Sequence, residues 1–295
     1  MPLPPLSDLP ADMPVLIAGP TGSGKSDLAM DIAERRGGVV VNADAIQVYA
    51  NWRVLTARPA PEDEARVPHR LYGHVAHNEP YSAGRWLREV APLLAGPDRP
   101  VIVGGTGLYF SALTEGLAQI PQTPRDIRTR AEALLAAGGI EALLAELDER
   151  TLSRIDRKNP RRVQRAWEVQ QTTGHGLAAW QDATPPPLLP ADACLRIVID
   201  APKEWLNQRL AARFDRMLDL GALDEARENL PHWSPEAPSS KAIGAAELIA
   251  HLRGEISLPA ARTAAITATR QFAKRQRTWF RARMKGWHRV SAQEI

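Results

Sequence analysis

Short apolar runs rich in β-branched residues alternate along much of the chain with longer stretches of helical periodicity. Apolar runs of this length are typical of strands that are buried on both faces of a parallel sheet. We predict four such strands, at Val15–Ala18, Val39–Asn42, Val101–Gly104 and Leu195–Asp200. The first run leads directly into a helical pattern and helical stretches separate the others, which is the rhythm of a doubly wound α/β domain.

The strand pattern disappears between the third and fourth of these runs. There Thr123-Pro124 and Asn159-Pro160 each combine a helix-capping residue with a first-turn proline. Helices are predicted over Arg125–Ala137, Ile140–Glu149 and Arg161–Thr172. We therefore expect an α/β core built from residues 1–115 and 189–295, interrupted by a helical insertion domain at residues 116–188.

A phosphate-binding pattern, G-x-x-x-x-G-K-[ST], follows the first predicted strand. It is formed by Gly19, Pro20, Thr21, Gly22, Ser23, Gly24, Lys25 and Ser26. The glycines let backbone N–H groups surround an anionic oxygen at a helix N-terminus. In such loops the lysine reaches the outer phosphate and the hydroxyl residue ligates Mg²⁺, which are the roles expected of Lys25 and Ser26. The pattern indicates a diphosphate or triphosphate ligand and does not decide between them.

Polar groups also follow the second and third predicted strands, and the carboxyl ends of parallel strands share one edge of a sheet. Asp44 is a candidate to accept a proton from a nucleophile or to orient a metal-bound water; a turn aspartate that binds its own backbone is the alternative. Thr106, among the glycines of Gly104–Gly107, is a candidate phosphate or acceptor contact, or part of a plain turn. Arg209 and Arg213, one helical turn apart, suit diphosphates, with a surface stripe as the alternative.

The net charge of +3 conceals a strongly basic C-terminal region. No acidic residue lies between Glu255 and Glu294, where the basic residues are Arg262, Arg270, Lys274, Arg275, Arg277, Arg281, Arg283, Lys285 and Arg289. One helix face is predicted to carry Arg270, Lys274, Arg277 and Arg281. The opposite face is predicted to dock on the core through Ala265, Ala268, Phe272 and Trp279. A basic face suits a nucleic-acid backbone and Trp287 a stacked base, whereas a solvated tail is the alternative.

Two further features bear on where the protein works. No stretch approaches the ~20 apolar residues of a membrane span, and the segment Met1–Asp8 lacks the basic and apolar regions of a signal peptide. The single cysteine, Cys194, cannot form an internal disulfide and is expected to act as a small buried hydrophobe. These observations predict a cytoplasmic protein without a membrane partner.

Taken together, these residues resemble the tRNA dimethylallyltransferase (tRNA isopentenyltransferase) family over about residues 15–287. Besides the phosphate loop, the resemblance rests on the segments Asn42–Tyr49, Pro68–Leu71, Tyr81–Ala83, Val103–Tyr109, Asn159–Arg162 and Arg270–Phe280. It implies a P-loop NTPase-like parallel sheet core with a helical insertion domain that contacts tRNA. A phosphate loop is common to many families, but this series of segments is not.

The resemblance implies that a dimethylallyl group passes from dimethylallyl diphosphate to the exocyclic N6 amine of the adenosine 3′ of the tRNA anticodon. It gives Asp44 the task of holding the amine and taking its proton, and Thr106 that of bridging acceptor and diphosphate. Arg213, the phosphate loop and Mg²⁺ on Ser26 would stabilise the departing diphosphate. The target base would have to leave the stack of the anticodon loop.

The resemblance also implies a set of contacts to the tRNA anticodon stem-loop. They are Asp44, Ala45, Ile46, Gln47, Thr106, Arg128, Arg161, Arg162, Val163, Gln164, Arg165, Lys241, Ala242, Ile243, Gly244, Lys274, Arg275, Gln276, Arg277, Thr278, Trp279, Phe280 and Arg281. Some positions depart from the family pattern, namely Ala45 (usually serine), Leu55 (glycine), Asn159 (aspartate), Ala245 (tyrosine) and Ala246 (a basic residue). None of them belongs to the phosphate loop or is Asp44 or Thr106, so an active enzyme is expected.

Three other interpretations share some of these features. A P-loop kinase of a nucleoside or small metabolite would use the same loop and Mg²⁺ but would not need a basic C-terminal helix. A non-catalytic, nucleotide-gated RNA-binding protein would use the basic helix without the transfer chemistry. Prenylation of free adenine nucleotides would leave the helical insertion and the basic face without a ligand. For the transferase we expect a monomer.

Overall fold

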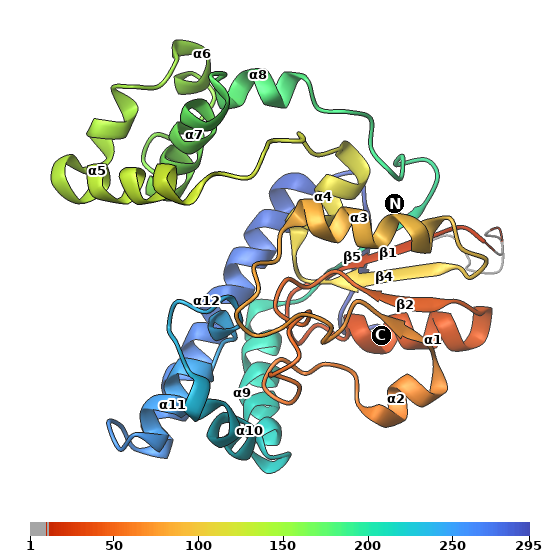
Figure 1. The fold of residues 1–295 in the computed structure, drawn as a ribbon. Helices are drawn as coiled ribbons and strands as arrows, with labels where there is room; N and C mark the ends of the chain where they lie inside the picture. Colours follow the sequence, from red (N-terminus) through yellow and green to blue (C-terminus); the bar gives the residue numbers. More distant parts are fainter. Residues whose placement is uncertain (1–9, 11) are drawn as a thin grey trace. The chain divides into compact units, whose positions relative to one another are not determined.

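The computed structural model of this chain describes residue 10 and residues 12–295. The segment Met1–Asp8, considered above for a signal peptide, lies outside the described residues. The chain divides into two compact units, of which one comprises the residues up to Thr114 together with Leu188–Ile295 and the other Glu115–Pro187 (Figure 1). Within the described part of the chain, no helix has the length and apolarity to cross a membrane.

A six-stranded parallel sheet lies at the centre of the first unit, with the order β3-β2-β4-β1-β5-β6 (Figure 1). The strands are β1 (Val15–Ala18), β2 (Val39–Asn42), β3 (His69–Arg70), β4 (Pro100–Gly104), β5 (Leu195–Asp200) and β6 (His288–Ser291). The predicted α/β class is confirmed, and all four predicted strands are present. The edge strands β3 and β6 were missed because their few residues are largely polar and form no apolar run.

Helices pack on both faces of the sheet, because successive side chains of a strand point to opposite faces. Ile17 of β1 belongs to a core that includes residues of α1 (Lys25–Arg36) and α9 (Lys203–Asp219). Its neighbour Leu16 belongs to a core on the other face, with α3 (Ala83–Leu94) and α4 (Gly107–Glu115). The phosphate loop therefore starts from a strand that is held firmly on both sides.

A third core lies among helices that follow β5. It contains residues of α9, α10 (Ala222–Asn229) and α11 (Ala245–Leu252), together with Trp52 and Leu55 from the segment after β2. The remaining short elements of this unit are α2 (Pro61–Arg66) and the 3₁₀ helices Leu230–His232 and Pro238–Lys241. The segment after β2 is thus anchored to the helical layer as well as to the sheet.

The basic C-terminal region forms α12 (Leu258–Arg283), which contributes to all three cores. Its buried residues are Ala261, Ala265, Ile266, Ala273, Gln276 and Phe280. The predicted apolar face was wrong in part, since Phe272 and Trp279 are only half-buried and Gln276 points inward. The prediction for Trp287 was also wrong, because this ring is buried, 5.4 Å from Phe110 between ring centroids, and does not extend the basic surface.

The second unit is helical and has a hydrophobic core of its own. Its helices are α5 (Arg125–Leu144), α6 (Glu149–Leu152), α7 (Pro160–Thr173) and α8 (Leu177–Asp182). Gly139, with φ +65°, interrupts α5 where a break was predicted. The predicted helix Ile140–Glu149 was too long, because Asp148 caps α6 by accepting a hydrogen bond from the Thr151 amide at 2.9 Å.

The two predicted helix caps in this unit differ in outcome. Asn159 caps α7, since its side-chain oxygen accepts from the Arg162 amide at 3.3 Å. Thr123 does not cap α5; its hydroxyl instead accepts a hydrogen bond from Arg165 at 2.7 Å. Thr123 and Arg165 lie far apart in the sequence, so no local sequence pattern indicates this contact.

Candidate active site

The phosphate loop joins β1 to α1 at the carboxyl edge of the sheet. Gly22 and Gly24 have φ values of +79° and +88°, in the left-handed region that favours glycine. A Cβ atom at Gly19 would lie 2.7 Å from Oγ of Ser23, so the loop closes tightly there. Ser23 is buried, and its hydroxyl has no hydrogen-bond partner among the described residues. A buried hydroxyl without a partner in such a loop is suited to donate a hydrogen bond to an oxygen atom of a bound phosphate.

Two partly desolvated cations accompany the loop. Burial lowers the pKa of Lys25 to about 8, against the attraction of Asp44 and with a further contribution from Arg213 on α9. Burial also lowers the pKa of Arg213, opposed by Asp27 and Asp44. The side chain of Arg213 forms neither a hydrogen bond nor an ion pair with residue 10 or residues 12–295. Its guanidinium group therefore keeps its donors for a ligand.

Arg209, predicted to share a helix face with Arg213, has a different role. Its Nε donates to the carbonyl oxygen of Gly22 at 3.1 Å, and its guanidinium carbon lies 4.7 Å from the ring centre of Trp205. These contacts attach α9 to the phosphate loop. Arg209 thus supports the loop, whereas Arg213 keeps its donors free.

Asp44 lies in a turn organised by Asn42, the buried last residue of β2. The Asn42 side chain accepts from the Asp44 amide at 2.8 Å and donates to the carbonyls of Asp44 and Leu71, each at 3.0 Å. Oδ1 of Asp44 accepts from the Ile46 amide at 2.9 Å. Oδ1 thus binds the backbone of its own turn, as the alternative of a turn aspartate predicts. Oδ2 has no hydrogen-bond partner among the described residues. Asn42 is a site residue that the sequence reasoning missed.

Thr106 connects the turn after β4 to the turn that carries Asp44. Its hydroxyl accepts from the Ala45 amide at 2.9 Å, and its own amide donates to the Ala43 carbonyl at 3.2 Å. The hydroxyl hydrogen stays available for a ligand. Gly104 allows the approach, because a Cβ atom there would lie 2.1 Å from the carbonyl oxygen of Ala43. The two turns predicted at the strand ends do come together.

Gln276 of α12 links the phosphate loop to the same turn. Its Oε1 accepts from the Thr21 amide at 3.0 Å, and its Nε2 donates to the Gly105 carbonyl at 3.0 Å. A Cβ atom at Gly107 would lie 2.2 Å from the ring of Trp279 on the same helix. One buried amide side chain therefore sets the spacing between the phosphate loop and the Thr106 turn.

These contacts lead to a prediction for Gln276→Ala. The variant should bind inorganic diphosphate roughly tenfold more weakly and lose about 2 kcal/mol of unfolding free energy, because a buried donor and a buried acceptor lose their partners. Affinity for RNA should stay the same. Calorimetric titration, thermal denaturation and filter binding measure the three quantities, with Gln271→Ala on the exposed side of the same helix as control. A selective loss of RNA affinity would show that Gln276 is an RNA contact instead.

A carboxylate from α10 holds the segment that follows the Asp44 turn. Glu225 accepts hydrogen bonds from the consecutive amides of Arg53, Val54 and Leu55, the last two at 2.9 Å. Gln47 donates to the carbonyls of residues 56 and 57, each at 2.9 Å, beside the positive φ of Ala57. Leu55 is buried in the third core, which explains why this chain accommodates leucine where glycine is usual.

We expect Glu225→Gln to loosen this segment. The glutamine side chain keeps only one acceptor oxygen, and that oxygen is uncharged, whereas the two carboxylate oxygens of Glu225 accept from three backbone N–H groups. The unfolding free energy should therefore fall by about 2 kcal/mol. Amide hydrogen exchange at residues 53–55 should become much faster. Mass-spectrometric exchange with Glu228→Gln, an exposed residue of the same helix, as control tests this. Equal protection of residues 53–55 in both variants would contradict the role given to Glu225.

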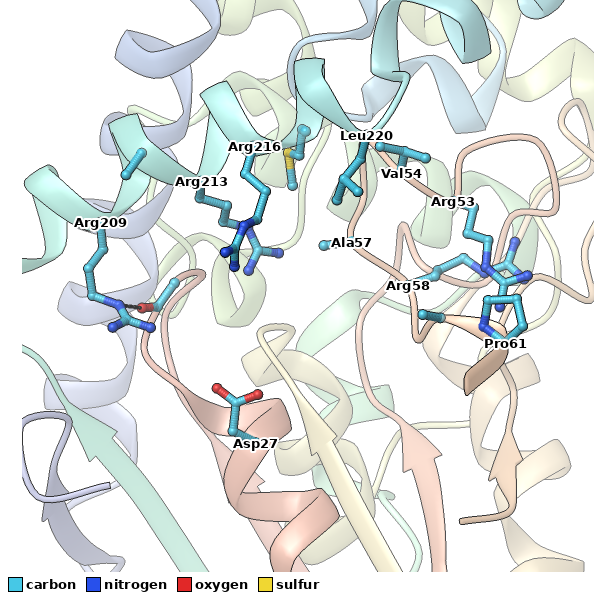
Figure 2. Close-up of a pocket in the computed structure, with 14 residues that line it drawn as sticks. Asp27, Arg53, Val54, Ala57, Arg58, Pro61, Arg209, Arg213, Arg216 and Leu220 are labelled. Atoms are coloured by element: carbon cyan, nitrogen blue, oxygen red, sulfur yellow. Dashed lines mark hydrogen bonds between the residues drawn. The ribbon is translucent and has the colours of Figure 1, made fainter. Parts of the chain in front are cut away.

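Two cavities border the phosphate loop. The larger, of about 760 Å³, is lined by Gly22, Asp27 and Arg213 on one side and by the segment after β2 on the other (Figure 2). The second, of about 580 Å³, is lined by Ser26 and Gln47 among others. Both volumes are in the range of small-molecule sites. The loop therefore borders one cavity at Gly22 and the other at Ser26.

The predicted tRNA contacts differ widely in exposure. The exposed ones are Arg128, Arg161, Arg162, Arg165, Lys241, Lys274, Arg275, Thr278 and Arg281. Half-buried are Asp44, Ala45, Ile46, Gln47, Thr106, Gln164, Ile243, Arg277 and Trp279. Buried are Val163, Ala242, Gly244, Gln276 and Phe280. The buried side chains form part of the protein core, so for these positions an RNA contact would have to come from the backbone or from a neighbouring residue.

Comparison with known proteins places these features in a family. The model of the IPP transferase family matches residues 47–283, and that of the isopentenyl transferases matches residues 13–75. A protein of Dinoroseobacter shibae named tRNA dimethylallyltransferase is 65% identical over 289 residues, covering 97% of each chain. One of the same name from Cereibacter sphaeroides is 61% identical, covering 98% of this chain and 92% of the relative.

Solved structures agree with these relatives. A tRNA isopentenylpyrophosphate transferase of Bacillus halodurans is 29% identical, with a TM-score of 0.68 over 95% of this chain and 90% of that one. A eukaryotic dimethylallyltransferase acting on tRNA is 26% identical, with a TM-score of 0.80 over 95% of this chain and 73% of that one. The resemblance drawn from the sequence motifs is thereby confirmed, and the chain belongs to the IPP transferase family, that of the tRNA dimethylallyltransferases.

Proposed function

We propose that this protein transfers the dimethylallyl group of dimethylallyl diphosphate to the exocyclic N6 amine of the adenosine 3′ of the anticodon in tRNA. Relatives named tRNA dimethylallyltransferases support transfer of a dimethylallyl group to tRNA. The observation that carries the proposal is a single hydrogen-bonded unit. In it Gln276 joins the phosphate loop to the Gly105 turn, and Thr106 joins that turn, through hydrogen bonds with Ala43 and Ala45, to the turn that carries Asp44.

The residues of this unit match the steps of the reaction. The bond between the allylic carbon and the diphosphate oxygen breaks, and the amine nitrogen forms a bond to that carbon. Asp44 takes the proton that the nitrogen loses, and the diphosphate leaves with the electron pair of the broken bond. Lys25, Arg213 and the loop amides stabilise the negative charge that develops there.

We further propose that Mg²⁺ accompanies the diphosphate. Ser26, the second residue of α1, is exposed and borders the smaller cavity, and the exposed Asp27 borders both cavities. Hydroxyl and carboxylate oxygens are ligands that Mg²⁺ prefers, so these residues fit the ion. When bound, Mg²⁺ offsets negative charge on the phosphate oxygens. Asp27 was not among the predicted ligands, although its position directly after Ser26 is visible in the sequence.

The exposed basic residues of α12 support RNA as the acceptor. Arg270, Lys274 and Arg275 project from the helix whose buried face carries Gln276, so RNA on the outer face would lie on the element that orders the phosphate loop. Phosphate contacts of this kind give strong, salt-dependent binding. A kinase has no use for this arrangement, and the comparisons do not favour that alternative. We propose that the enzyme acts as a monomer in the cytoplasm.

The proposal is tested with purified protein, Mg²⁺, dimethylallyl diphosphate and an unmodified tRNA that has adenosine after the anticodon. Nucleosides from a digest are then analysed by mass spectrometry. A dimethylallyl increment on adenosine is expected, and a matched tRNA with guanosine at that position should remain unmodified. A dimethylallyl increment on both tRNAs would contradict the proposed position of the modified adenosine. If neither tRNA gained the increment although the protein bound diphosphate, the proposed reaction would be contradicted.

A further inference from the structure

Two of the sequence segments that carry the family resemblance have no part in the chemistry above. They are Pro68–Leu71, which contains β3, and Tyr81–Ala83, which leads into α3. Residues 71–75, at the end of the first segment and just after it, form hydrogen bonds to the turn of Asp44 and to the residues that follow that turn. Both segments are therefore candidates to determine where Asp44 lies.

Residues 71–75 hold the Asp44 turn at both of its ends. Before the turn, the carbonyl of Leu71 accepts from the side chain of Asn42 at 3.0 Å, and Asn42 is the residue that organises the turn. After the turn, the amides of residues 73 and 75 donate to the carbonyls of residues 47 and 48, each at 2.9 Å. The position of Asp44 therefore depends on the position of residues 71–75.

The backbone of this segment needs support from outside. Leu71 has a φ of +64°, in the left-handed region that a leucine rarely adopts. Such a conformation persists only where contacts of the surrounding structure stabilise it, and it is typical of functional sites. The hydrogen bond from Asn42 to Leu71 is one such contact, and others come from α3.

A carboxylate of α3 supplies these other contacts. Oε2 of Glu89 accepts from Nε2 of His74 at 2.8 Å and from the hydroxyl of Tyr81. Oε1 accepts from Nε of Arg85 at 2.8 Å. The rings of His74 and Tyr81 meet edge to face, with 5.6 Å between their centres. Against burial, which acts in the opposite direction, the hydrogen bonds of these three donors lower the pKa of Glu89. Glu89 is thus ionised at neutral pH and accepts hydrogen bonds only.

We propose that Glu89 is a positioning residue for Asp44 and acts through His74 and residues 71–75. This inference rests on the proposed function, because it takes Asp44 as the group that accepts the proton. The same helix also fixes Asn42 directly, since the buried indole of Trp86 donates to the Asn42 carbonyl at 2.7 Å. Helix α3 therefore supports the Asp44 turn at two points.

The rate constant of dimethylallyl transfer in His74→Phe, measured with the full-length protein at saturating tRNA, tests this role. Phenylalanine keeps the ring contact with Tyr81 and removes the hydrogen bond to Glu89. The rate constant should fall roughly tenfold, while KM for dimethylallyl diphosphate changes less than twofold. His74→Gln, which retains a donor near the position of Nε2, should recover most of the loss. Glu79→Gln is the matched control and should be neutral, because Glu79 pairs with Arg85 on the exposed side of the same network.

Amide hydrogen exchange gives a second readout, which does not require activity. The amides of Asp44 and Ile46, which donate to the side chains of Asn42 and Asp44, should exchange faster in His74→Phe than in the wild type and the control. His74 is exposed, so its replacement leaves the hydrophobic cores intact.

The two readouts together decide the outcome. A wild-type rate in His74→Phe, or a rate in His74→Gln as low as that of His74→Phe, would overturn the positioning role. A lower rate with unchanged exchange at residues 44 and 46 would make His74 a substrate contact and overturn it as well. Faster exchange in a protein that transfers no dimethylallyl group to tRNA would count against the proposed function and leave the support of the turn standing.

Discussion

Asp44→Asn is expected to lower the rate constant of dimethylallyl transfer about a thousandfold while fold and diphosphate affinity remain. The two carboxylate oxygens of Asp44 have separate tasks. Oδ1 accepts from the Ile46 amide at 2.9 Å, which the side-chain oxygen of asparagine also does. Because an amide takes no proton from the attacking nitrogen, the loss should fall on kcat and leave KM for dimethylallyl diphosphate nearly unchanged.

Single-turnover rates at saturating tRNA measure this effect. Asp31→Asn is the matched control, since Asp31 lies on the outer side of α1 in an exposed pair with Arg35. Its rate should equal that of the wild type. If Asp44→Asn retained more than a tenth of the wild-type rate, the proton would have to go to another group.

Lys25→Met is expected to lower kcat/KM for dimethylallyl diphosphate by a factor of about 10² to 10³. The Lys25 ammonium group is partly desolvated, and its Nζ lies 3.5 Å from the Pro20 carbonyl, a weak contact that a phosphate oxygen would replace. Methionine preserves the length of the side chain and removes the charge. Lys203→Met, at the exposed start of α9, is the control and should be neutral.

The pKa of Lys25 also predicts a pH dependence. With a value of about 8 in the free enzyme, Lys25 is charged at pH 7 and largely neutral at pH 9. Diphosphate binds the charged form, so the affinity should fall as pH rises between these values, whereas in Lys25→Met this fall should disappear. Titrations over this range measure it. A wild-type affinity that is flat across the range would contradict the lowered pKa.

The strands that carry the site were predictable because their signal is local. Continuous apolar runs marked β1, β2, β4 and β5, and the carboxyl ends of parallel strands share an edge, so Asp44 and Thr106 were expected near the phosphate loop. Hydrogen bonds of Thr106 to Ala45 and of Gln276 to the loop bear out that proximity. The expected monomer, the cytoplasmic location and the Mg²⁺ requirement remain predictions.

The contacts that organise the site were not predictable, because they join residues far apart in the chain. Gln276 meets Thr21 and Gly105, and Glu225 meets Arg53, without any local pattern that indicates the partner. In the sequence Gln276 stood within a basic stretch and was taken for an RNA contact. Its burial was missed because hydrophobic periodicity assigns a polar residue to the surface, even where two hydrogen-bond partners hold that residue inside the protein.

The order of the strands has a consequence for how the chain folds. The central strand β1 pairs with β4 and with β5, and β5 reaches its place only after the whole helical unit Glu115–Pro187 has been synthesised. The last strand, β6, adds to β5 later still. Contacts of such long sequence separation slow folding, whereas the helical unit has local contacts and its own core. On the ribosome, the inserted unit should therefore acquire structure before the sheet that flanks it in sequence is complete.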